Sequence, residues 1–203
     1  LATSTGNSNV SVVLRAGNDI NINQAITLDG TGTLTLEADG NTANGAGDLV
    51  FGASGSLITA NQAISITAFD LNLTSGTIDA GTGDVTILTS FGGNIGVGDD
   101  AFSGVAMQVD ETELGNITAN NLNIGDSSTT GNLIVDAASS FTNISSLNLT
   151  TTSAGTVTFE AGTLNTGSAN LTVSSGGDIT QNGTVTVGGN ASFTSGTGSI
   201  TLN

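Results

Sequence analysis

The residues best suited to do chemistry are two adjacent aspartates, Asp99 and Asp100, which follow Gly98. Paired carboxyl groups act as general acid and general base or nucleophile in the cleavage of glycosidic bonds. The rest of the chain gives such a pair little help, because it has no histidine, no cysteine and one basic side chain, that of Arg15. We therefore expect these aspartates to lie in a solvated acidic loop, and we expect no enzyme activity and no catalytic residues.

A group of carboxylates close in the sequence offers a second chemistry, the binding of a hard cation. Calcium takes six to eight oxygen ligands from such groups and from carbonyls. The stretch AGTGDVTIL also resembles the calcium-binding nonapeptide repeat, although Asp84 follows its glycine directly and no second copy stacks behind it. Solvated acidic edges explain these residues adequately, so we expect no cofactor, and calcium is the one ion that they would suit. The grouped carboxylates are Asp99, Asp100, Asp110, Glu111 and Glu113.

The charge of the chain excludes several classes of partner. Seventeen acidic residues against one basic residue give a formal net charge of −16. This leaves no electrostatic basis for binding nucleic acid and disfavours docking on anionic membranes. No apolar run approaches the roughly 20 residues that span a bilayer. We expect no nucleic-acid partner and no insertion into a membrane.

Apolar residues recur in pairs at alternate positions, separated by Thr, Ser or Asn and bounded by Gly, Asn or Asp. This pattern predicts strands of about three to five residues with one face inward and one face in water. One helical turn is expected at 110–117, where Asp110 would cap it and Leu114 and Ile117 would share a face. The pairs are Val12/Leu14, Ile20/Ile22, Ile26/Leu28, Leu34/Leu36, Leu49/Phe51, Ile64/Ile66, Leu71/Leu73, Val85/Ile87, Leu122/Ile124, Leu133/Val135, Leu147/Leu149, Val157/Phe159, Leu171/Val173, Val185/Val187, Ala191/Phe193 and Ile200/Leu202.

These strands group into similar units of about 20 to 25 residues, a period typical of solenoids. Units that stack in parallel align like residues and create one continuous core. We therefore predict an all-β fold, a parallel β-helix (β-solenoid) of about eight or nine coils and roughly 40 Å long. Residues 1–203 would form a single domain, with longer coils or insertions near 33–62 and 84–120.

Several side chains receive structural expectations from this fold. Arg15 is expected to pair with a carboxylate on an adjoining coil. The Asn-x-Ser/Thr triplets at Asn148, Asn170 and Asn182 follow from strand alternation and are poor evidence of glycosylation. The seven phenylalanines are expected to fill the core: Phe51, Phe69, Phe91, Phe102, Phe141, Phe159 and Phe193.

Threonines at alternate positions suggest a binding face. Flat rows of Thr on a solenoid resemble ice-binding surfaces, but Thr is also a good outward strand residue. The copies are too scattered to predict a single row. They are Thr33/Thr35, Thr156/Thr158 and Thr184/Thr186.

The stretches LRAGNDININQAITLDGTGTLTLEADGN and SSGGDITQNGTVTVGGNASFTSGTGSITLN resemble repeats of filamentous haemagglutinin-type bacterial surface proteins. The resemblance implies a right-handed parallel β-helix that is exported to the cell surface, commonly by a two-partner route. It also implies a role as an adhesin or a structural fibre. The paired aspartates resemble part of a polygalacturonase active site, but that pattern needs a histidine and a basic pair, which this chain lacks.

We expect an extracellular structural or adhesive β-helix segment that forms the body of a bacterial surface fibre. Neither terminal stretch carries an amphipathic helix or a charged cap, so an open sheet edge would invite another chain. The expected partners are copies of the chain stacked end to end, or neighbouring repeats of the same protein. The alternative is a glycan- or ice-binding β-solenoid module with a receptor at the cell surface. The absence of Trp and Tyr weighs against sugar binding.

Overall fold

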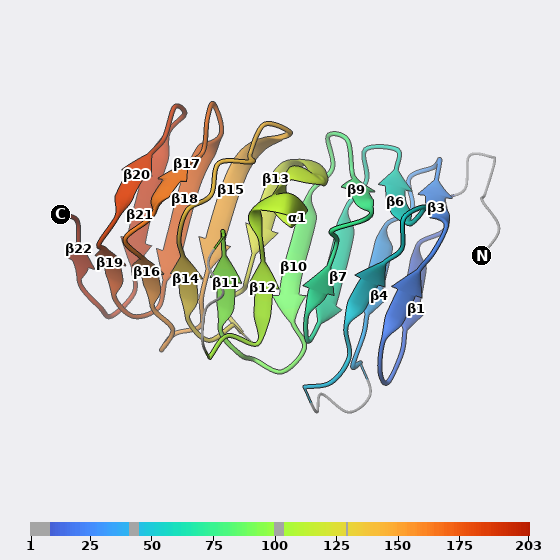
Figure 1. Cartoon of the computed structure of the whole chain (residues 1–203), viewed down its shortest axis with the longest axis horizontal. Helices are drawn as coiled ribbons and strands as arrows, with labels where there is room; N and C mark the ends of the chain where they lie inside the picture. Colours follow the sequence, from blue (N-terminus) through green and yellow to red (C-terminus); the bar gives the residue numbers. More distant parts are fainter. Residues whose placement is uncertain (1–8, 41–44, 100–103, 129) are drawn as a thin grey trace.

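The computed structural model describes residues 9–40, 45–99, 104–128 and 130–203. In these residues the chain forms short strands throughout and one short helix, α1, at Glu111–Gly115. Every strand pairing in this part of the chain is parallel. The strands follow one another along the long axis in sequence order, apart from one exchange described below (Figure 1). The all-β prediction is confirmed, and the parallel stacking is compatible with a β-solenoid.

An eleven-stranded sheet runs the length of the described chain. Its main path follows the order β1-β4-β7-β10-β13-β15-β18-β21, and β3, β6 and β9 join it through β13. The strands on the main path are β1 (Val12–Arg15), β4 (Leu34–Glu37), β7 (Ile64–Ala68), β10 (Val85–Thr89), β13 (Ile117–Ile124), β15 (Ile144–Thr150), β18 (Asn170–Ser175) and β21 (Ala191–Ser195). The three further strands are β3 (Ala25–Leu28), β6 (Ser56–Thr59) and β9 (Thr77–Asp79).

Three smaller sheets form the remaining strand layers. The six-stranded sheet contains β12 (Met107–Val109), β11 (Ile95–Val97), β14 (Leu133–Val135), β16 (Val157–Phe159), β19 (Ile179–Gln181) and β22 (Ile200–Thr201). The three-stranded sheet contains β2 (Ile20–Ile22), β5 (Leu49–Phe51) and β8 (Leu71–Asn72). The two-stranded sheet contains β17 (Thr163–Asn165) and β20 (Thr184–Thr186).

The register of the large sheet shows how much chain lies between successive strands. Leu147 pairs with Leu171, a step of 24 residues (147 to 171), and Leu171 pairs with Ala191, a step of 20 (171 to 191). Two steps are longer. One runs over 30 residues (34 to 64) and the other over 37 (85 to 122). These steps fall where the sequence contains its two longer stretches.

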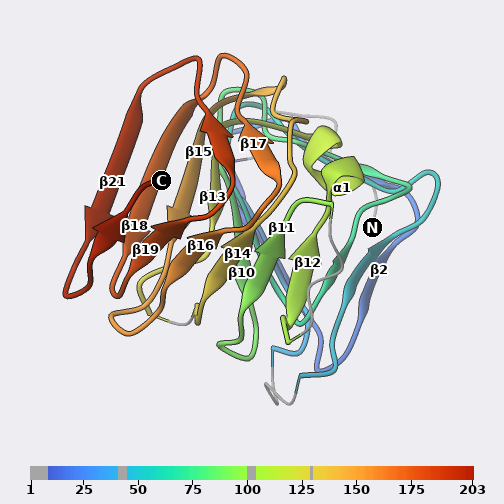
Figure 2. The same cartoon turned by 60° about the vertical axis from the view of Figure 1, so that its left-hand side comes forward.

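The longest step contains the one exchange in strand order. In the six-stranded sheet β12 lies outside β11, on the side away from β14, although β12 follows β11 in the sequence. The chain therefore turns back after β11 before it reaches β12 and then α1. Figure 2 shows these strands side by side, with α1 beyond the end of β12. Among the described residues, no helix has the length and apolar character needed to cross a membrane.

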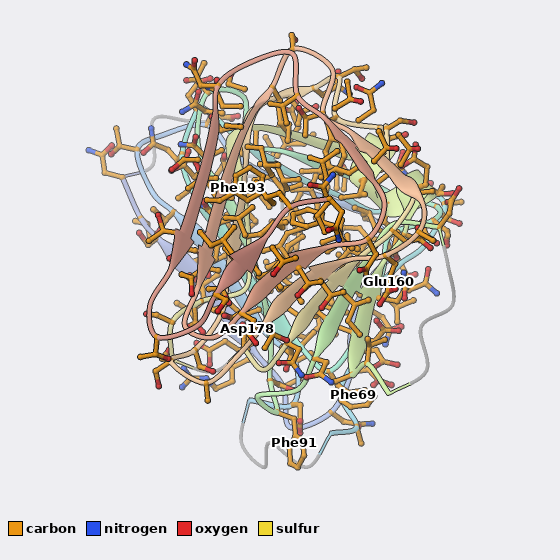
Figure 3. All side chains as sticks on the ribbon, turned by 90° about the vertical axis from the view of Figure 1, so that its left-hand side faces the viewer. Phe69, Phe91, Glu160, Asp178 and Phe193 are labelled. Carbon is orange, nitrogen blue, oxygen red and sulfur yellow. The ribbon has the colours of Figure 1, made fainter. Side chains whose placement is uncertain are left out.

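The core is a column of aliphatic side chains in register. The inward positions of neighbouring strands carry Leu34, Ile64, Val85, Leu122 and Leu147, and each is 0% exposed. An end view shows the strands around an interior filled with side chains (Figure 3). Since burial of each such side chain stabilises the fold by roughly 1.5–3 kcal/mol, this column is the main source of cohesion between successive units.

The prediction that every phenylalanine fills the core is wrong for one of them. Phe91 is 58% exposed, and in Figure 3 its label lies outside the strand layers. Phe69 is half-buried. A side chain at Gly45 would meet the rings of both, so Phe69 and Phe91 pack at a loop. Phe51, Phe141 and Phe159 are buried, Phe193 is half-buried, and Phe102 lies outside the described residues.

Candidate functional site

Helix α1 starts with a capping box, a local signal that the sequence contains as Asp110-Glu111-Thr112-Glu113. The Asp110 carboxylate accepts a hydrogen bond from the Glu113 amide (2.9 Å), and the Glu113 carboxylate accepts one from the Asp110 amide (3.0 Å). This arrangement satisfies two amides that the first helical turn leaves without intrahelical partners. The predicted helical turn with Asp110 as its cap is confirmed. Ile117, expected on the same turn, instead begins β13.

Glu113 also reaches across to another coil. Its second carboxylate oxygen accepts a hydrogen bond from the Leu73 amide at 2.8 Å, and the side-chain amide of Asn116 donates to the Leu73 carbonyl at 2.9 Å. Leu73 directly follows the two residues of β8. Side chains of α1 thus bind both backbone groups of Leu73, in the way that a neighbouring strand would.

The Glu113 carboxyl lies in an acidic environment with little access to water. The residue is 4% exposed. Burial, together with the charges of Asp110 and Asp70, raises the pKa of Glu113 to about 7, although its two amide donors oppose this. Burial also raises the pKa of Asp70, and Asp110 adds to that shift. A hollow of about 230 Å³ is lined by these three carboxylates together with Leu71, Asn72, Thr74 and Gln108.

Glu111 points to different partners from Glu113. Its carboxylate accepts hydrogen bonds from the Ser139 amide (2.9 Å), the Ser139 hydroxyl (2.7 Å) and the Ser140 hydroxyl (2.9 Å). Burial would raise the pKa of Glu111, but these serine donors together hold it below its ordinary value. Glu111 therefore connects α1 to the segment after β14 as a charged group.

The structure does not bring the predicted calcium ligands together. Asp110 caps α1, while Glu111 and Glu113 bind separate backbone segments. Asp99 is exposed, and its amide donates to the Ala137 carbonyl. Asp100 lies outside the described residues. Within the part of the chain that the structure describes, no group of three or more acidic residues is arranged to hold a metal ion.

Asp84 has a role in the ladder between coils. Its carboxylate accepts a hydrogen bond from the backbone amide of Asn121 at 3.2 Å and another from the Asn121 side chain at 2.8 Å. Asn121 lies on the next strand of the large sheet, 37 residues away. The stretch AGTGDVTIL thus places its carboxylate against a neighbouring strand.

The outward face of the large sheet carries one row of small polar residues. The register aligns Thr35, Ser65, Thr86, Asn123, Asn148, Thr172 and Ser192 across successive strands. Side-chain hydrogen bonds join part of this row, from Asn148 to Asn123 at 2.8 Å and from Asn123 to Thr86 at 3.3 Å. Sequence reasoning did not find this row, because its members differ in type and are related only through the register.

The predicted threonine pairs lie on three different sheets. Thr35 lies on β4 of the large sheet, Thr158 on β16 of the six-stranded sheet, and Thr184 and Thr186 on β20 of the two-stranded sheet. Thr33 and Thr156 each bond a neighbouring coil, at Ser11 and Asn132 respectively. These pairs therefore do not form a common surface.

Residues 146–203 match a family described as repeats of unknown function (DUF5649). These residues contain the two shortest coil steps at the carboxyl-terminal end of the large sheet, of 24 and 20 residues. Comparison with curated proteins and with solved structures gave no match. The repeat character of this part of the sequence thus agrees with its regular stacking.

Of the triplet asparagines, two lie within ladders between coils. Asn148 donates to Asn123, and the Asn170 side chain donates to the Ser146 hydroxyl and accepts from the Asn190 amide. Asn182 is exposed. The alternation of the strands accounts for the position of each triplet.

Arg15 pairs with Glu37, directly opposite it on the next strand of the large sheet. The predicted ion pair between adjoining coils is confirmed. The hydrogen bond from Arg15 holds the pKa of Glu37 below its ordinary value, and the same bond raises the pKa of Arg15. Because the Arg15 side chain is 53% exposed, water and salt screen this pair, and it contributes little to stability.

Proposed function

We propose that this chain is a right-handed parallel β-helix of about eight or nine coils, in one domain, that serves as a structural or adhesive segment of an extracellular bacterial surface fibre. The observation that carries this proposal is the unbroken parallel register of the large sheet from Val12 to Ala191. Each unit in such a stack contacts only its neighbours, so the protein extends in one dimension. This is the geometry that a stiff spacer needs.

The distribution of polar groups supports a mechanical role. Backbone ladders connect successive strands, and the described outer row of the large sheet adds side-chain hydrogen bonds between coils. The resemblance to filamentous haemagglutinin-type repeats and the match to a repeat family favour an array of such units. The strong negative charge favours a separate, soluble rod over association with anionic surfaces.

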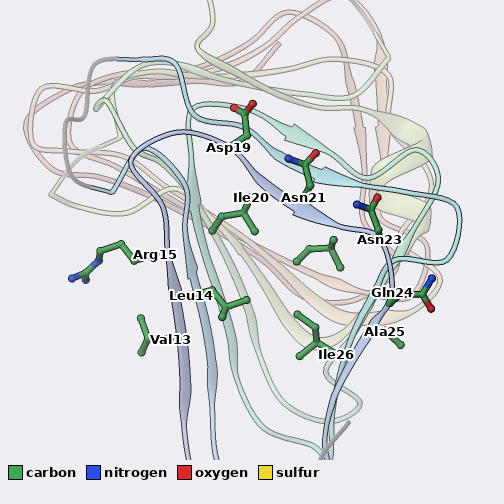
Figure 4. Close-up of a pocket in the computed structure, with 11 residues that line it drawn as sticks. Val13, Leu14, Arg15, Asp19, Ile20, Asn21, Asn23, Gln24, Ala25 and Ile26 are labelled. Atoms are coloured by element: carbon green, nitrogen blue, oxygen red, sulfur yellow. The ribbon is translucent and has the colours of Figure 1, made fainter. Parts of the chain in front are cut away.

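The end strands suggest how units would join. The first described coil has a hollow of about 670 Å³ whose apolar lining includes Leu14, Ile20 and Ile26 (Figure 4). At the other end, Ile200 and Leu202 are 44% and 55% exposed, and residues 179–203 contain no charged side chain. A further coil from the next copy would pair with these strand edges and cover their apolar groups. A head-to-tail contact of this kind gives open filaments.

Sedimentation and electron microscopy of the chain over a range of concentrations test this proposal. We expect particles of constant width that lengthen with concentration. Leu202→Lys should shorten them, because it places a charge in the joint, whereas Thr172→Lys on the lateral face should not. A monomer of fixed length at every concentration, or equal effects of the two variants, would contradict end-to-end assembly.

The second candidate is a glycan- or ice-binding module, and the outer row from Thr35 to Ser192 favours it. Its hydroxyl and amide groups repeat at the spacing of parallel strands, about 4.8 Å, and would face a flat ligand. Glycan-array binding or thermal hysteresis that is lost in Thr172→Lys, with assembly unchanged, would favour this candidate over the fibre. The absence of Trp and Tyr weighs against it.

A further inference from the structure

Helix α1 interrupts the regular stack at a defined position. It follows β12, the strand that lies out of sequence order, and it precedes β13, whose first residues pair with β9. The backbone of Leu73 therefore finds its partners on the side chains of Glu113 and Asn116, at 2.8 and 2.9 Å. The contact between these coils depends on a titratable side chain at this point.

The surroundings of Glu113 contain no compensating positive charge. The carboxylates that face it are those of Asp70, before β8, and Asp110, before α1. Asp48 lies beyond Asp70 and repels it in turn. Arg15 is the one basic side chain of the sequence, and it pairs with Glu37. Ionisation of Glu113 thus adds a third negative charge to a cluster that is largely closed to water.

We propose that α1 is a pH-sensitive clamp, which holds the Leu73 coil while Glu113 is protonated and releases it as Glu113 ionises near neutral pH. The sign follows from linkage between proton binding and opening. The closed clamp retains its proton up to a pKa of about 7, whereas the open segment has the ordinary value of 4.5. The closed state therefore binds more protons between these two values, and opening becomes easier as the pH rises through this window.

Amide hydrogen exchange of the full chain, corrected for the intrinsic effect of pH, measures this opening. We expect the opening constant at the Leu73 and Leu114 amides to rise about 10-fold from pH 6 to pH 8. The Leu171 amide, which bonds the Asn190 carbonyl in a distant coil, should show no such rise. A pH-independent opening constant at Leu73 and Leu114 would overturn the proposal.

Two glutamine variants separate the clamp from general effects of charge. Glu113→Gln should abolish the pH-dependent rise. Glu111→Gln on the same helix should retain it, because its serine donors hold the pKa of Glu111 below its ordinary value and it stays ionised across this window. An equal rise in wild type and Glu113→Gln would contradict the clamp.

A direct titration covers the case in which Glu113→Gln fails to fold. Carbon-detected nuclear magnetic resonance of the wild-type side-chain carboxyls should show one glutamate with a midpoint near 7. Asp70→Asn should lower that midpoint, since it removes one of the repelling charges while its side-chain oxygen can still accept from the Gln108 amide. A Glu113 midpoint at its ordinary value would overturn the proposal, whatever the behaviour of the variants.

Discussion

The side-chain amide of Asn148 donates a hydrogen bond to the side-chain oxygen of Asn123, directly opposite it on the preceding strand, with an Nδ2–Oδ1 distance of 2.8 Å. Asn123 donates in turn to the Thr86 hydroxyl. Three strands of the large sheet are thus joined on the outside by polar side chains, and on the inside by the aliphatic column. The outer surface therefore takes part in the cohesion of the stack.

Asn148→Ala should lower the free energy of unfolding by about 1 kcal/mol, because it removes the bond to Asn123. Thr172→Ala changes the next residue of the same row, which no described side-chain hydrogen bond joins to its neighbours, and should have a smaller effect. Urea unfolding measures both. Equal losses in the two variants would show that the asparagine bond adds nothing beyond the presence of a side chain.

Leu147→Ala should destabilise the protein by about 2–5 kcal/mol, since Leu147 is 0% exposed and stacks between Leu122 and Leu171. The same change at Leu88, on the outward side of β10, should lower the unfolding free energy by at most about 1 kcal/mol. Thermal or urea unfolding tests the difference. A loss at Leu88 that equals the loss at Leu147 would contradict the assignment of inward and outward faces.

Gly125→Ala should be more destabilising than Gly167→Ala. Both glycines have positive φ, of 78° and 58°, so both variants share the left-handed backbone cost of about 1–2 kcal/mol. A methyl group at Gly125 would also lie 2.3 Å from the Thr150 carbonyl oxygen, whereas nothing lies within 4 Å at Gly167. Unfolding that is equally easy in the two variants would show that the strand after β15 does not approach Gly125 so closely.

Global stability should fall as the pH rises from 6 to 8. The raised pKa of Glu113 contributes stability that is fully present below 4.5 and is lost as the pH passes through about 7. The loss over this interval should be about 1.4 kcal/mol from this residue. Urea unfolding of wild type and Glu113→Gln at both pH values isolates it. A wild-type stability that rises over this interval would contradict the burial of the Glu113 carboxyl.

Short-range patterns predicted most of the strands. The first residue of every apolar pair lies in a strand, from Val12 in β1 to Ile200 in β22. Strands such as β6, β9 and β17 were missed, because each buries one large aliphatic residue, Leu57, Ile78 or Leu164, and so shows no alternation. A period of two cannot be read from a single inward residue.

Long-range features could not be predicted from these patterns. The exchange of β11 and β12 depends on which strands meet across the sheet, and no local property of Met107–Val109 encodes that order. The capping box of α1 is visible in the sequence, but the bond from Leu73 to Glu113 spans 40 residues. Carboxylates are almost never fully buried unless paired, so a buried glutamate in an acidic cluster runs against the ordinary expectation.

Distances between spin labels along the outer row test the central claim most directly, that successive units lie parallel on one another in one stack. Labels on Ser192 and, in turn, on Asn148, Thr86 and Thr35 span two, four and six steps of the register. The account predicts separations that grow linearly, by about 4.8 Å for each step. Separations that do not increase in this order would contradict the stack and the fibre role proposed for it.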